Sequence, residues 1–173
     1  MLIGEKISLR PITAADLELL EAWANDSAIN SEYNTFALRP RGQIPRAFAE
    51  SGFLSDTHGE LIVCTQAGET AGDVSYRSIS HGPNSSRAYQ IGITLAPPYR
   101  GHGYGAEAQR LLVAYLFATY PIERVEAETD VTNKAEQRAL ERAGFTREGV
   151  LRRAQWRNGS WHDLVMYSKL RGE

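Results

Sequence analysis

The stretch IGITLAPPYRGHGYG, residues 91–105, joins an apolar segment to a pair of prolines and then to a loop rich in glycine. The apolar segment Ile91–Leu95 predicts a strand that ends at Pro97-Pro98, because proline cannot donate a ladder hydrogen bond. Glycines let backbone N–H groups approach a ligand closely, and a helix N-terminus adds unpaired donors and partial positive charge. The stretch therefore predicts an anion-binding loop at the mouth of a helix, with Arg100 as a further charged contact.

Two common phosphate-binding loops do not match this stretch. A Walker A loop ends in Gly-Lys-Ser/Thr, which this loop lacks. A dinucleotide fingerprint has the spacing G-x-G-x-x-G after the first strand of a βαβ unit, whereas the spacing here is G-x-G-x-G after an antiparallel meander. A glycine-rich helix start that binds nothing is the alternative.

The segments before the loop predict a strand, two helices and an antiparallel meander. Residues 6–12 alternate apolar and polar side chains, as a half-buried strand does. Thr13 fits a helix N-cap with Asp16 three residues later, and Pro45 is expected to open a short helix after the turn-rich residues 30–45. The meander strands are expected at residues 61–66, 72–79 and 88–95.

The segments after the loop predict two more helices and three more strands. An apolar stripe with helical spacing predicts a helix from about residue 105 to the residue before Pro121. Asn133 is expected to cap a further helix, with Glu136 completing a reciprocal capping box. Strands are expected at 124–131, 145–156 and 161–170, the last two joined by an Asn-Gly hairpin turn. This order of elements predicts an α/β fold.

The composition narrows the classes of function. The 173 residues are expected to form a single domain, residues 1–173. The net charge of −2 lacks the basic excess of a nucleic-acid-binding protein. No apolar run approaches the ~20 residues that span a bilayer, and we see no signal peptide, so a cytoplasmic protein is expected. Cys64, the only cysteine, is expected in the core, and the histidine spacing predicts no metal site.

The loop Arg100–Gly105 matches the pattern R/Q-x-x-G-x-G/A of the GNAT acyltransferases. Further matches cover nearly the whole chain, and they are Leu9-Arg10-Pro11, Trp23, Asn25-Asp26, Arg124-Val125-Glu126, Asn133, Ala143-Gly144-Phe145, Glu148–Arg152 and Trp161-His162-Asp163. The sequence therefore resembles this superfamily, and within it the branch of the ribosomal-protein N-terminal acetyltransferases, the RimJ/RimL type. The resemblance implies a mixed, mostly antiparallel sheet of about seven strands with a central splay, and about four helices.

The resemblance also implies acetyl-CoA as the cosubstrate and a homodimer formed through the C-terminal strands. The pantetheine arm would enter where two parallel strands separate after a bulge in Ile91–Leu95, and would pair with the backbone of Ile93 and Leu95. Asn133 matches a position that contacts pantetheine in relatives, and a plain helix cap is its alternative role. The pyrophosphate would be held by the amides of Arg100, Gly101, His102, Gly103, Tyr104 and Gly105.

The sequence departs from this family at the catalytic positions. Many members carry a tyrosine seven residues after the asparagine, and this chain has Leu140 at that position. Several carry a serine three residues after the asparagine, and this chain has Glu136 there. The position before Ile-Gly, often an acid in the family, is occupied by Gln90. The remaining candidates for the general base are Glu128 and Glu126, which share one face of their strand. An ion-paired or solvated strand face is the alternative for both.

The acceptor is expected to be a primary amine. A site with a weak base suits an acceptor amine of low pKa. An α-amino group titrates near ~8, whereas a lysine side chain titrates near ~10.4. The sequence therefore favours an N-terminal α-amine as the acceptor. Trp23, Tyr33, Phe36 and Tyr76 are candidates to line the acceptor pocket, with core packing as the alternative for Trp23 and Tyr76. Three other functions stay open: acetylation of a small molecule such as an antibiotic or metabolite, use of a longer acyl-CoA, and binding of CoA without chemistry.

Overall fold

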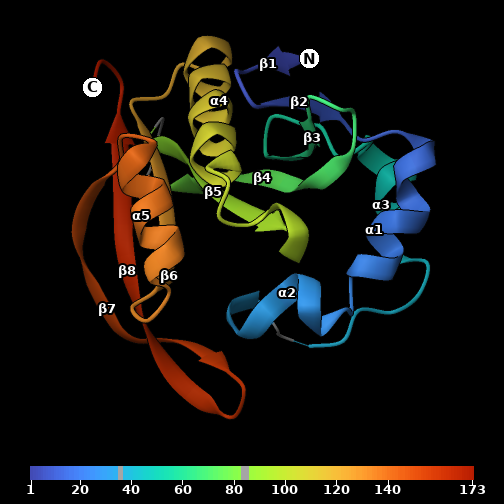
Figure 1. The fold of residues 1–173 in the computed structure, drawn as a ribbon. Helices are drawn as coiled ribbons and strands as arrows, with labels where there is room; N and C mark the ends of the chain where they lie inside the picture. The colour runs from blue at the N-terminus through green and yellow to red at the C-terminus, as the bar shows by residue number, and fades with distance from the viewer. Residues whose placement is uncertain (35–36, 83–85) are drawn as a thin grey trace.

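A mixed sheet forms the centre of the computed structural model, which describes residues 1–34, 37–82 and 86–173 (Figure 1). In the described part of the chain the sheet has eight strands in the order β1-β2-β3-β4-β5-β6-β8-β7, and β5 and β6 are its only parallel neighbours. The strands are β1 (Leu2–Ile3), β2 (Ile7–Pro11), β3 (His58–Thr65), β4 (Thr70–Ser80), β5 (Arg87–Leu95), β6 (Arg124–Asp130), β7 (Thr146–Arg157) and β8 (Ser160–Leu170). The predicted mixed, mostly antiparallel sheet is confirmed.

Helices cover both faces of this sheet. The helices are α1 (Leu17–Trp23), α2 (Ser27–Asn34), α3 (Gln43–Ser51), α4 (Tyr104–Thr119) and α5 (Lys134–Arg142), with 3₁₀ turns η1 (Ala14–Asp16) and η2 (Pro97–Tyr99). The larger apolar core includes Leu9 and Val63 of the sheet and Leu112 of α4. A smaller cluster under α1 and α3 includes Ile62 and Cys64, which alternate with Val63 along β3 and so face the opposite side.

Local signals account for most of these elements. The capping box of Thr13 and Asp16 opens η1, and α4 begins within one residue of its predicted start. The Asn158-Gly159 turn has φ values of 50° and 78°, as a two-residue hairpin turn requires.

The region before β3 differs from the prediction. α2 lies partly within residues that the sequence predicts as turns, and its Ser31 has a non-helical φ of 56°. α3 begins at Gln43, so Pro45 is its third residue rather than its first. The short β1, which pairs with β2, was not predicted either.

The parallel strands β5 and β6 separate partway along their length. Their pairing ends at Ile91 and Ala127, although β5 continues to Leu95. The predicted central splay is therefore confirmed. The predicted bulge in Ile91–Leu95 is wrong, because β5 stays in continuous register with β4. β6 likewise stays in register with β8, so the splay arises where two well-paired halves of the sheet diverge.

Candidate active site

The loop between β5 and α4 presents a row of unpaired backbone donors. Gly101 and Gly103 have φ values of 82° and 84°, a left-handed conformation that favours glycine. In the described part of the chain, the N–H groups of residues 101–106 donate to no protein acceptor, and the first helical bond runs from the N–H of Glu107 to the carbonyl of Gly103. The N–H of Arg100 is not available, because it donates to the carbonyl of Pro97 at 3.2 Å.

The open edge of β5 presents a second set of backbone groups. The N–H of Ala96 donates to the carbonyl of Ala71 on β4 at 2.9 Å, so residue 96 faces β4. Because successive residues of a strand face opposite edges, Ile93 and Leu95 turn their N–H and carbonyl groups towards the splay. β6 does not pair with this part of β5, so a ligand with amide groups can add to this edge.

Four clefts surround the splay. The loop cleft, about 490 Å³, is lined by Ile93, Leu95, Arg100, Gly101, Gly103, Gly105, Asn133, Glu136 and Arg142, among others. The splay cleft, about 130 Å³, is lined by Ile93, Gln109, Glu128, Asp130, Glu136 and Arg157, among others. The acidic cleft, about 280 Å³, is lined by Trp23, Arg39, Glu60, Asp73, Gly92 and Ile93, among others. The outer cleft, about 410 Å³, is lined by His58, Tyr76, Gln90, Gly92 and Glu128, among others.

Arg100 ties the loop to α2. Its Nε donates to the carbonyl of Leu95 at 2.8 Å, and one NH2 group donates to the carbonyls of Ala28 and Ile29 at 2.9 and 2.7 Å. The guanidinium is therefore held by three backbone carbonyls at the wall of the loop cleft. His102 and Tyr104 stack on each other with ring centroids 5.6 Å apart, and neither side chain lines the loop cleft.

Asn133 caps α5, as the sequence predicts, and it also lines the loop and splay clefts. Its Oδ1 accepts a hydrogen bond from the N–H of Glu136 at 3.2 Å. The reciprocal half of the predicted capping box is wrong, because the N–H of Asn133 donates to the carbonyl of Asp130. The carboxylate of Glu136 turns instead towards α4, where Gln109 Nε2 donates to it at 2.9 Å.

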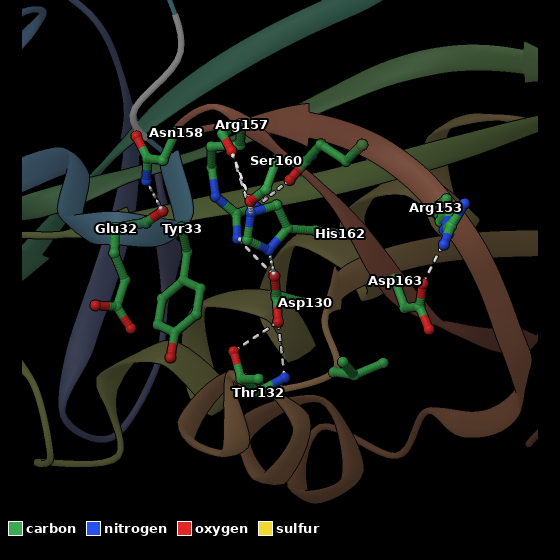
Figure 2. A network of polar contacts seen from close by, with 12 residues as sticks. Glu32, Tyr33, Asp130, Thr132, Arg153, Arg157, Asn158, Ser160, His162 and Asp163 are labelled. Atoms are coloured by element: carbon green, nitrogen blue, oxygen red, sulfur yellow. Dashed lines mark hydrogen bonds and ion pairs between the residues drawn. The ribbon is translucent and has the colours of Figure 1, made fainter.

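A buried ion pair fixes the turn that carries Asn133 (Figure 2). Asp130 Oδ2 accepts hydrogen bonds from Arg157 of β7, at 2.5 Å, and lies 3.0 Å from Nδ1 of His162. Its Oδ1 accepts from the N–H and hydroxyl of Thr132 at 2.7 and 2.6 Å. Burial works to raise the pKa of Asp130, but the hydrogen bonds from Thr132 and Arg157 outweigh it and lower the pKa to about 2.

The two predicted base candidates lie in different surroundings. Glu126 is buried and ion-paired with Arg124, its Oε1 also contacts Nε2 of His81, and Arg124 also pairs with Glu148. Glu128 is partly buried and lines both the splay cleft and the outer cleft. The structure therefore brings Glu128 to the clefts around the splay, whereas Glu126 lines none of these four.

The predicted acceptor-pocket residues are also divided. Trp23 lines the acidic cleft, and Tyr33 lines the loop and splay clefts, with the guanidinium of Arg157 5.7 Å from its ring centroid. Tyr76 borders the outer cleft but is only 3% exposed, and it packs edge-on against Tyr89. Phe36 lies outside the described residues.

The sequence interpretation missed the carboxylates of the acidic cleft. The register of β3 and β4 pairs Ile62 with Asp73 and Glu60 with Ser75, so Glu60 and Asp73 are diagonal neighbours on one face. Burial, and then the neighbouring Glu60, raise the pKa of Asp73 well above its ordinary value, and burial likewise raises the pKa of Glu60. The available signal was a carboxylate next to apolar residues in each strand, Glu60 before Leu61 and Asp73 before Val74.

The described residues also bear on metal binding and on membrane insertion. They contain no group of three or more His, Cys, Asp or Glu side chains that would hold a metal ion. None of their helices has the length and apolar character needed to cross a membrane.

Comparisons with known proteins agree with this geometry. The model of the acetyltransferase (GNAT) domain family matches residues 6–146. The uncharacterized N-acetyltransferase YoaA of Bacillus subtilis (strain 168) is 29% identical over 170 residues, which cover 95% of this chain and 93% of YoaA.

Two solved structures share the fold over nearly their whole length. RimL, a ribosomal L7/L12 α-N-protein acetyltransferase in complex with coenzyme A, matches with a TM-score of 0.82 and 21% identity, covering 97% of this chain and 96% of RimL. The microcin C7 self immunity acetyltransferase MccE, in complex with acetyl-CoA and AMP, matches with a TM-score of 0.78 and 25% identity, covering 96% of this chain and 93% of MccE. Because the family match spans most of the sequence, the chain belongs to the GNAT acetyltransferases and is an acyl-CoA N-acyltransferase.

Proposed function

We propose that the chain binds acetyl-CoA with its diphosphate on the amides of residues 101–106 and its thioester beside Ile93, and that it acetylates a primary amine. The observation that carries this proposal is the run of unpaired N–H groups at the start of α4. Such a run attracts an anion through hydrogen bonding and the helix dipole together. The loop cleft continues from these amides to the open edge of β5, which suits the amides of a pantetheine arm.

Ile93 marks the proposed position of the thioester. It lines the loop, splay and acidic clefts, so a cosubstrate in the first and an acceptor in the third can meet beside it. The thioester supplies the activated acetyl group. The N–H of Ile93 faces the splay and is placed to donate to the carbonyl oxygen as negative charge develops there. Asn133 borders the same place, where its amide can contact the arm while its Oδ1 caps α5.

We assign the role of general base to Glu128. The attacking amine must be neutral, so a proton has to leave the nitrogen before or during attack. Glu128 lines the splay cleft and the outer cleft, and both of these share Gly92 with the acidic cleft. Glu126 is the weaker candidate, because Arg124 and His81 already contact Oε1 of its carboxylate.

The acceptor that this site favours is a protein N-terminal α-amine. At pH 7 about one tenth of a group with a pKa near ~8 is neutral, against less than one thousandth of a lysine side chain with a pKa near ~10.4. A site with one partly exposed carboxylate as base favours the amine that is already partly neutral. RimL, which shares the fold, is a ribosomal L7/L12 α-N-protein acetyltransferase, and this likeness supports the proposal.

Paired peptide substrates test the choice of amine. We expect a peptide with a free α-amine and no lysine to be acetylated more than about 100-fold faster at pH 7 than its N-blocked counterpart carrying one lysine, because of the difference in neutral fraction. The measurement is release of free CoA thiol, with mass spectrometry of the peptide. Equal rates, or faster acetylation of the lysine peptide, would contradict the assignment of an α-amine.

A small-molecule acceptor with more than one positive charge is the second candidate. It is favoured by the acidic cleft, where Glu60 and Asp73 lie on one face beside Ile93, with Arg39 as the neighbouring cation. A second ammonium group of the acceptor, bound there, would compensate two partly buried carboxyl groups whose pKa values burial raises.

The variant Asp73→Asn tests this second candidate. If the acceptor is a diamine, D73N should raise its KM at least about 10-fold, the loss of roughly 1.4 kcal/mol, while the KM of a monoamine changes little. Asp56→Asn is the matched control, because the Asp56 side chain is 70% exposed and lies outside the acidic cleft. A diamine KM that is the same in D73N and D56N would exclude the acidic cleft as a cation site.

A further inference from the structure

The carboxyl group of Glu136 lies at the junction of two clefts. It projects from the first turn of α5 and lines both the loop cleft and the splay cleft, together with Ile93, Tyr33 and Asn133. It does not line the acidic or outer clefts on the acceptor side. Both carboxyl groups line the splay cleft, but Glu136 also lines the loop cleft of the proposed cosubstrate, whereas Glu128 also lines the outer cleft.

One neutral donor holds the Glu136 side chain in this position. Gln109 Nε2 of α4 donates to Glu136 Oε1 at 2.9 Å, and Gln109 itself is only 1% exposed. The other polar atom of that amide, Gln109 Oε1, is buried and has no hydrogen-bond partner among the described residues. An amide with one unused acceptor beside a carboxyl group can hold that group either as a carboxylate or, after rotation of the amide, as a carboxylic acid.

Among the described residues, the carboxyl group of Glu136 has a hydrogen-bond partner in Gln109 but no ion-pair partner. Burial raises its pKa to about 7, although the Gln109 hydrogen bond acts to lower it. Asp130, by contrast, is paired with Arg157. The titratable and charged residues that line the two clefts around Glu136 are Tyr33 of α2, Glu128 and Asp130 of β6, Arg157 of β7, Arg100 of the loop, and Arg138 and Arg142 of α5.

We infer that Glu136 is the catalytic acid that protonates the departing thiolate of coenzyme A, an assignment that rests on the proposed function. The nitrogen of the neutral amine forms a bond to the carbonyl carbon of the thioester. The carbon–sulfur bond breaks, and its electron pair takes the proton of the Glu136 carboxyl group to give the thiol. The amine nitrogen loses its proton to Glu128. The Glu128 proton then passes through water to Glu136, which restores both groups.

The position of Glu136 distinguishes this role from two others. A pure capping role would place its carboxylate on the N–H of Asn133, but that N–H donates to the carbonyl of Asp130. A role as the base for the amine would require contact with the acceptor clefts, which Glu136 does not line. Two carboxyl groups in different surroundings on either side of one reacting bond suit a division into acid and base.

The pH profile of Glu136→Gln tests the assignment. The glutamine keeps the shape and can still accept the Gln109 hydrogen bond, but it cannot release a proton. We expect kcat to fall about 100-fold, the lower range for loss of an acid or base, while the Kd of CoA measured by calorimetry stays within twofold. In the wild type, the protonated acid is lost as the pH rises through its pKa, so kcat should decline above about pH 7. E136Q should lack this alkaline decline.

A second variant separates chemistry from folding. Glu136→Asp keeps a titrating carboxyl group at a shorter reach, so it should show intermediate kcat and retain the alkaline decline. If E136Q keeps wild-type kcat, or shows the same alkaline decline as the wild type, Glu136 is not the acid. If the wild type itself does not bind CoA, the proposed function fails, whereas normal CoA binding with an unchanged E136Q profile contradicts only the role of Glu136.

Discussion

Gly101→Asp should weaken CoA binding at least 100-fold, which corresponds to about 2.7 kcal/mol. A Cβ at Gly101 would meet no heavy atom within 4 Å, so the substitution does not clash with the protein. Its carboxylate would instead lie at the loop whose amides we propose to hold the diphosphate, and juxtaposed like charges cost several kcal/mol. Calorimetric titration with CoA measures the effect.

Gly68→Asp is the matched control for this variant. Gly68 lies in the turn between β3 and β4, has a φ of 83° against 82° for Gly101, and also has open space around its Cβ position. Both variants force aspartate into the left-handed region, so they should lose similar stability, of the order of 1 kcal/mol. Equal CoA affinity in G101D and G68D would show that the diphosphate does not bind at this loop.

Arg157→Met should lower the free energy of unfolding by about 3–5 kcal/mol at pH 7, because it removes the guanidinium from the buried Asp130 carboxylate and leaves only Thr132 and the His162 ring against it. The Asp130 and Arg157 side chains are only 1% and 3% exposed, so water cannot replace the lost partner. Urea unfolding followed by circular dichroism measures the change. CoA binding should weaken in parallel, since the Asp130 turn carries Asn133.

The double variant Asp130→Asn, Arg157→Met is the control for this effect. Removing both charges should recover part of the stability, because neutral groups cost less to bury than one unpaired charge. If the free energy of unfolding of R157M lies within about 1 kcal/mol of the wild-type value, the Asp130–Arg157 pair does not stabilise the turn as the structure indicates.

The Asp130 carboxylate, held by Thr132 and then by Arg157, also makes the stability depend on pH in acid. The pKa of Asp130 is lowered from 3.8 to about 2 in the folded chain, so the folded state favours its charged form. This contribution is fully present above pH ~4 and is lost as the pH falls towards about 2, a change of about 2 kcal/mol. The acid limb of an unfolding profile should be less steep in the D130N variant.

Local patterns in the sequence predicted much of the fold. The apolar stripe of α4, the Asn133 cap and the Asn158-Gly159 turn each depend on residues close together in the chain, so they can be recognised without tertiary information. The glycine loop is likewise local, since positive φ values favour glycine whatever surrounds it.

The features that failed to emerge from the sequence depend on distant contacts. The sequence of α2 has no apolar periodicity strong enough to predict a helix. Its carbonyls accept hydrogen bonds from Arg100, which lies about 70 residues further along the chain. The partner of Glu136 is Gln109, 27 residues away on another helix, so local capping rules predicted the wrong partner. The pairing of Glu60 with Asp73 in one cleft depends on the register of β3 and β4.

Titration of ¹⁵N-labelled protein with CoA, followed through its backbone amide shifts, locates the bound cosubstrate residue by residue. We expect the largest shifts on saturation at residues 101–106 and at Ile93 and Leu95, with little change in the same amides of G101D. Saturable binding with the largest shifts elsewhere, or no binding at millimolar CoA, would contradict the claim that these amides hold the cosubstrate.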